Sequence, residues 1–191
     1  MTERWVSMGR RSRAWAVTAA AAIVLSACGG GGGGGLGKSS AEQYVKTVCT
    51  SIGDWVKDIQ TRVGKVQKEN PSSPQEGKKT ITEFFDGVIG STGKLVGEIK
   101  AAGTPDVDNG AQISSSVVTA LQKAQSLLQQ ARARVQALPT DNPHAFVTAV
   151  QQISTAVQGA FEKAGKQFSN LKSSQLETAA SKEPACKALG G

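Results

Sequence analysis

The chain has 191 residues, of which 19% are charged, 39% hydrophobic and 5% aromatic. This composition is ordinary for a soluble globular protein with a mostly aliphatic core, and the length allows one domain of about 150 residues after an N-terminal segment. The formal net charge of +7 falls to +4 without the four arginines and one glutamate of residues 1–13. The other basic residues are scattered rather than interleaved with aromatics, which argues against nucleic acid as a partner.

Residues 1–27 have the layout of an export signal. Residues 1–13, MTERWVSMGRRSR, are basic, and residues 14–27, AWAVTAAAAIVLSA, form an uninterrupted small or apolar run. A transmembrane helix needs about 20 apolar residues, and this run is shorter. We therefore predict a signal peptide rather than a permanent membrane span. The Arg10-Arg11 pair leaves both the general and the twin-arginine export routes open.

The end of this segment, Leu25-Ser26-Ala27-Cys28, resembles the lipobox of bacterial lipoproteins, in which a branched apolar and two small residues precede an obligatory cysteine. The resemblance implies that Cys28 receives a diacylglyceryl group and becomes the first residue of the mature protein. It also implies anchoring at the cell membrane, facing outside the cytoplasm. The alternative is secretion after cleavage behind Ala27, which would leave an exposed free thiol. As a whole, the chain is similar to small actinobacterial lipoproteins of unassigned function.

Seven consecutive glycines follow Cys28. We predict that residues 28–38 are the lipidated cysteine and a flexible tether with an end-to-end distance of about 18 Å. Each buried methylene contributes about 0.8 kcal/mol, so two acyl chains hold a soluble domain stably at the membrane. The glycines lack a preceding strand and a following phosphate-binding signature, which excludes a nucleotide loop. The folded domain is expected over residues 39–191.

Helical periodicity begins at Ser39, which forms an S-x-x-E capping box with Glu42. Apolar residues from Val45 to Val66 then step by three or four and predict a first helix with one apolar face. This face includes Ile52, Trp55 and Ile59. The segment from Glu69 to Pro74 ends the helix.

Three more helices are expected. Apolar positions from Ile81 to Ile99 predict the second, which Gly103 and Pro105 end. Positions from Val117 to Leu138 predict the third; either Thr104 caps it, or Asn109-Gly110 delays its start. Positions from Phe146 to Leu171 predict the fourth, which begins near Asn142-Pro143.

Four amphipathic helices joined by short loops predict an all-α domain, an antiparallel up-down-up-down four-helix bundle. A swapped or three-helix arrangement is the alternative. Lipidation of Cys28 leaves two cysteines, Cys49 in the first helix and Cys186 after the expected helix breaker Pro184. An even number of cysteines in an exported protein predicts a Cys49–Cys186 disulfide. The bundle allows this bond because the start of the first helix and the end of the fourth lie at the same end.

Candidates for catalysis are few, and we predict no enzyme, no metal and no cofactor. The only histidine, His144, is expected to be solvent-exposed in the first turn of the fourth helix. Asp54 and Asp58 lie one helical turn apart, but Lys57 and Arg62 are within reach to neutralise them, which favours a salt-bridged surface. Hydrolase, nucleotide-binding and metalloprotease motifs are missing from the sequence.

The second helix carries four glycines, Gly87, Gly90, Gly93 and Gly97, on the side opposite its main apolar residues. Each costs a helix up to about 1 kcal/mol relative to alanine. The functional interpretation is a surface that a partner approaches closely, or a helix that opens to admit an apolar ligand. Compositional bias is the alternative. We therefore expect a membrane-anchored lipoprotein whose helical bundle binds an unknown protein partner, or else carries a lipid or other apolar ligand between its helices.

Overall fold

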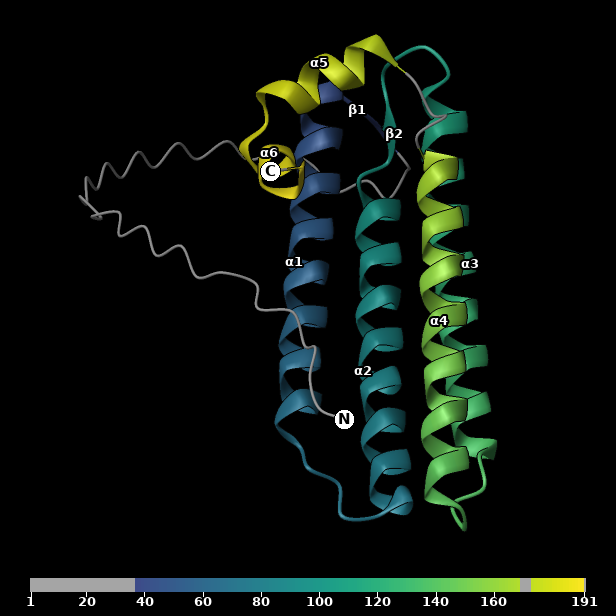
Figure 1. Ribbon diagram of the computed structural model, residues 1–191. Helices are drawn as coiled ribbons and strands as arrows, with labels where there is room; N and C mark the ends of the chain where they lie inside the picture. Colours follow the sequence, from purple (N-terminus) through teal and green to yellow (C-terminus); the bar gives the residue numbers. More distant parts are fainter. Residues whose placement is uncertain (1–36, 169–172, 191) are drawn as a thin grey trace, which may run out of the picture. The chain divides into compact units, whose positions relative to one another are not determined.

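The computed structural model describes residues 37–168 and 173–190, without the side chains of residues 163–168. The fold is all-α: these residues form six helices and two strands of two residues each (Figure 1). In chain order the elements are β1 (Lys38–Ser39), α1 (Ala41–Lys68), α2 (Pro74–Ala101), β2 (Thr104–Pro105), α3 (Gly110–Ala137), α4 (Pro143–Phe168), α5 (Ser174–Lys182) and α6 (Pro184–Gly190). The predicted signal, the Leu25–Cys28 motif, glycines 29–35 and Leu171 lie outside the described residues.

Helix α1 begins one residue later than the sequence predicts. The hydroxyl of Ser40, not that of Ser39, accepts the N–H of Gln43 at 3.2 Å, so the predicted capping role of Ser39 is wrong. Ser39 belongs instead to β1, which pairs in parallel with β2. Its carbonyl oxygen accepts the backbone N–H of Asp106 at 2.8 Å. This pairing fixes the chain just before α1 against the connection between α2 and α3.

Helix α2 starts at Pro74, which the sequence placed in a loop. Proline suits this position because the first turn of a helix does not use its N–H. The Ser73 hydroxyl accepts the N–H of Glu76 at 3.3 Å, and the Glu76 carboxylate accepts the N–H of Ser72 at 2.7 Å. The bonds from Ser72 lower the pKa of Glu76. This reciprocal capping defines the start of α2.

The connection between α2 and α3 depends on two residues with positive φ. Gly103, at φ 77°, ends α2 as predicted, and Asn109, at φ 58°, precedes α3. Of the two predicted starts for α3, the later one at Gly110 is correct. A side chain at position 110 would collide with the backbone, because a Cβ on Gly110 would lie 2.0 Å from the carbonyl oxygen of Pro105.

The four long helices contact one another in sequence order: α1 packs on α2, α2 on α3 and α3 on α4. Their buried side chains form two clusters. The first joins α2, α3 and α4 and consists of Phe85, Val88, Leu128, Ala131, Val135 and Ile153. The second joins α2 and α3 and consists of Leu95, Val96, Ile99 and Leu121, with Val48, Ile52 and Trp55 of α1 against it. The predicted apolar faces are therefore the packed ones.

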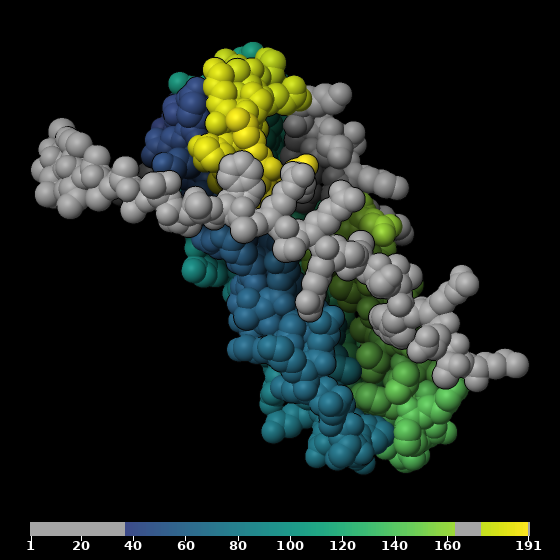
Figure 2. Space-filling model, turned by 60° about the vertical axis from the view of Figure 1, so that its left-hand side comes forward, coloured from purple at the N-terminus to yellow at the C-terminus, as the bar shows by residue number. Residues whose placement is uncertain are grey.

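Two short helices, α5 and α6, follow the long ones and were not predicted. Both contact α1, and Figure 2 shows them in yellow over its first turns. Pro184 follows the end of α5, as expected of a helix breaker, and is also the first residue of α6. The predicted disulfide is confirmed: Cys49 of α1 and Cys186 of α6 are bonded, with Cα atoms 5.0 Å apart.

Candidate functional site

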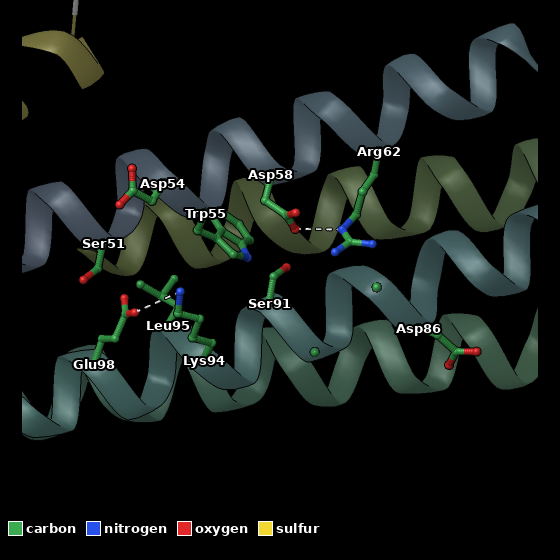
Figure 3. Close-up of a pocket in the computed structure, with 12 residues that line it drawn as sticks. Ser51, Asp54, Trp55, Asp58, Arg62, Asp86, Ser91, Lys94, Leu95 and Glu98 are labelled. Atoms are coloured by element: carbon green, nitrogen blue, oxygen red, sulfur yellow. Dashed lines mark hydrogen bonds and ion pairs between the residues drawn. The ribbon is translucent and has the colours of Figure 1, made fainter.

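A polar groove of 470 Å³ runs between α1 and α2 and is called the α1–α2 groove here. Figure 3 shows Asp54, Asp58 and Arg62 on α1, and Ser91, Lys94 and Glu98 on α2. The described residues that line it are Ser51, Asp54, Trp55, Asp58, Arg62, Asp86, Gly87, Gly90, Ser91, Lys94, Leu95 and Glu98. The groove therefore has a mixed lining in which acidic side chains outnumber basic ones.

The charges of the α1–α2 groove are neutralised in pairs. The Arg62 Nε donates to Asp58 at 2.7 Å, and the Lys57 and Asp54 side chains lie 3.7 Å apart, as the sequence predicted. The hydrogen bond from Arg62 lowers the pKa of Asp58 and keeps this carboxylate ionised. Within the described residues, His, Cys, Asp and Glu form no group of three that could hold a metal ion.

The floor of this groove contains a hydrogen bond that sequence reasoning missed. The Trp55 indole Nε1 donates to the Thr92 Oγ1 at 3.1 Å, and the Thr92 hydroxyl donates to the carbonyl of Val88 at 2.7 Å. Thr92 has 0% exposure, whereas Trp55 is half-buried. Trp55 therefore belongs to the core, as predicted, but it also joins α1 to α2 through a polar bond.

A second concavity, called the apolar cavity here, has a volume of 430 Å³ and walls from all four long helices. Twelve of its lining residues are apolar: Ile59, Val63, Ile81, Phe84, Phe85, Val88, Leu128, Val135, Val150, Ile153, Val157 and Phe161. The other two are Ser154 and Gln158 of α4. Val63 keeps 37% of its surface exposed, so this end of the predicted α1 face is only partly covered.

The four glycines of the predicted partner surface do not form one open face. The Arg62 guanidinium covers Gly87, since an added Cβ would lie 1.8 Å from its Nη1, and Gln125 of α3 would meet one on Gly93 at 2.9 Å. Gly90 and Gly97 have open space beside them. A protein partner at these two positions stays a prediction. The structure also places His144 at the surface in the first turn of α4, as expected.

Comparisons with protein-family models, with curated proteins and with solved structures find no match to this chain. Among the helices that the structure describes, none is long and apolar enough to cross a membrane. The sites described above therefore have to be interpreted from their own chemistry.

Proposed function

We propose that the protein is a lipid-anchored lipoprotein of the cell membrane, facing outside the cytoplasm, whose helical domain binds an apolar ligand such as a lipid. The basic and apolar signal layout and the likeness of Leu25–Cys28 to a lipobox support the anchor. The apolar cavity supports the ligand. The protein acts as a binding module and not as an enzyme.

The four long helices form an antiparallel up-down-up-down bundle. The apolar cavity lies where side chains of all four helices meet. Three observations support this arrangement. Each long helix packs on the next, the connections between them are short, and the disulfide links α1 to the segment that follows α4. Only short connections are needed when successive helices are antiparallel neighbours.

The lining of the apolar cavity is the observation that carries the proposal. Its 430 Å³ lies within the roughly 300–1,000 Å³ that is usual for small-molecule sites. Twelve apolar side chains face this partly open space, and few polar groups there could bind water. An apolar ligand would cover these side chains and remove its own surface from water.

The ligand proposal is tested on the protein purified from its native membrane, by mass spectrometry of the extracted lipids. A matched pair of variants locates the site: Val157→Phe fills the apolar cavity, and Val147→Phe makes the same change at a 54% exposed position of the same helix. We expect a stoichiometric lipid in the parent and in Val147→Phe, and a strongly reduced amount in Val157→Phe. Equal lipid in both variants, with both folded by circular dichroism, would contradict the proposal.

The anchor is tested separately by Cys28→Ser. Without an acceptor sulfur for the diacylglyceryl group, the variant should appear in the medium. A double variant in which both disulfide cysteines are replaced by serine is the control, because it leaves the lipobox intact and should stay in the membrane fraction. Retention of Cys28→Ser in that fraction would show that the protein is held by another means.

A further inference from the structure

No charged side chain stands in the described lining of the apolar cavity. Its fourteen lining residues include no Asp, Glu, Lys, Arg or His, and its polar groups are the hydroxyl of Ser154 and the amide of Gln158. Both residues are exposed on α4 and lie four positions apart, so they project from the same side of this helix. They therefore form a neutral polar rim beside an apolar interior.

The neutrality extends along the helix that supplies this rim. Between His144 and Glu162, α4 contains no Asp, Glu, Lys or Arg in seventeen residues, and its exposed polar positions there are Gln, Thr and Ser. A solvent-exposed helix usually carries charged residues on its outer face. Charge is therefore missing from residues 145–161 of α4 as well as from the described lining of the cavity.

A low overall content of charged residues does not explain this pattern. The α1–α2 groove of the same domain has a similar volume, 470 Å³, and six of its twelve lining residues are charged. The two concavities share α1 and α2, yet only one of them is lined with ions. Among the described residues, charged side chains therefore line the α1–α2 groove and not the apolar cavity.

An ionic headgroup would find no opposite charge among the described lining residues, so it would gain no ion pair at this exposed rim. A neutral hydroxyl or ester group can instead exchange hydrogen bonds with Ser154 and Gln158. We infer that the ligand is an uncharged acylglycerol, with an acyl chain in the apolar cavity and its glycerol part at Ser154 and Gln158. This inference rests on the proposed function, because it specifies the ligand of the same cavity.

Two ligands with the same acyl chain separate the inference from the proposed function: lauroylglycerol, which is neutral, and laurate, which is anionic at neutral pH. Both are offered to the full chain carrying Cys28→Ser, purified without detergent, in equilibrium dialysis below their micelle-forming concentrations. We expect lauroylglycerol to bind about fivefold more tightly, because its glycerol hydroxyls can both donate to and accept from Ser154 and Gln158, whereas a carboxylate can only accept.

The three other outcomes are distinct. Equal affinities, or tighter binding of laurate, would overturn the inference and leave the apolar-ligand function standing. Absence of binding by both would overturn the proposed function itself. Binding that is unchanged by Val157→Phe would place the ligand outside the apolar cavity and contradict both.

A gain of binding provides a second test. Gln158→Lys adds a cation at the rim, whereas Gln152→Lys adds one at an exposed position of α4 outside the cavity lining. We expect Gln158→Lys to raise the affinity for laurate about tenfold or more, because a charge-assisted hydrogen bond forms. Gln152→Lys should leave it unchanged. Equal gains in both variants would show a general attraction of the anion to added positive charge. No gain in Gln158→Lys would show that the headgroup does not lie at this rim.

Discussion

The hydrogen bond between Trp55 and Thr92 should contribute measurably to stability. Thr92→Val keeps the shape of the side chain but removes the acceptor for the indole N–H, which lies 3.1 Å from the Thr92 oxygen. Thr92 is completely buried, and the variant leaves the indole N–H of Trp55 without its acceptor. Leaving a buried donor unpaired costs about 1–3 kcal/mol. Because Trp55 is only half-buried, water can satisfy part of this loss, so we expect about 1 kcal/mol.

The control is Thr82→Val in the same helix. The Thr82 hydroxyl donates to the carbonyl of Lys78 at 2.8 Å, just as Thr92 donates to Val88, but no indole bonds to it in the described structure. Urea unfolding followed by circular dichroism gives both free energies of unfolding. A cycle with Trp55→Phe should return a coupling energy of about 1 kcal/mol. If Thr92→Val and Thr82→Val cost the same, the indole bond contributes nothing and the reasoning is refuted.

Three other predictions concern stability. Replacing both cysteines of the disulfide by alanine should lower the free energy of unfolding by up to about 5 kcal/mol in guanidinium titrations, because the bond closes a separation of 137 residues. Gly110→Ala should cost about 1–3 kcal/mol, because its Cβ would collide with the carbonyl oxygen of Pro105. Gly97→Ala has open space beside it and should stabilise α2 by about 0.5–1 kcal/mol. If thermal unfolding found the Gly110→Ala variant more stable than the Gly97→Ala variant, this reasoning would be wrong. Because Arg62 lowers the folded-state pKa of Asp58, this carboxylate stabilises the protein above about pH 4 and loses that effect as the pH falls through its folded-state pKa. Asp58→Asn should therefore flatten the acid limb of the stability profile, and an unchanged limb would count against the ion pair.

The long helices could be predicted from sequence because their spacing and their stop signals are local. The apolar residues from Val45 to Val66 fall within α1, and Gly103 adopts the positive φ expected at the end of α2. The error at Ser39 has a non-local cause. Two serines stand side by side, and the choice between them is made by the pairing of β1 with β2, more than sixty residues away.

Helices α5 and α6 were missed for a related reason. Segments of nine and seven residues are too short to be stable as isolated helices, so their own periodicity is a weak signal. They gain stability from contact with α1 and from the Cys49–Cys186 bond. The disulfide itself was predictable, because the expected export signal and the cysteine count need no knowledge of the intervening fold.

The apolar cavity depends on the size of the side chains at the inward positions, which helical periodicity alone does not show. Periodicity identifies which positions face inward, and the residues at those positions decide whether the interior is filled. Between Phe146 and Phe161 the inward positions of α4 hold only Val150, Ile153 and Val157, and α1 contributes Ile59 and Val63 opposite them. Aliphatic side chains of this size bury less area than aromatic ones, and the aromatic side chains of the cavity, Phe84, Phe85 and Phe161, come from α2 and the far end of this α4 segment. The apolar cavity therefore depends on the side-chain volumes at the inward positions of all four long helices together, and the periodicity of a single helix does not reveal it.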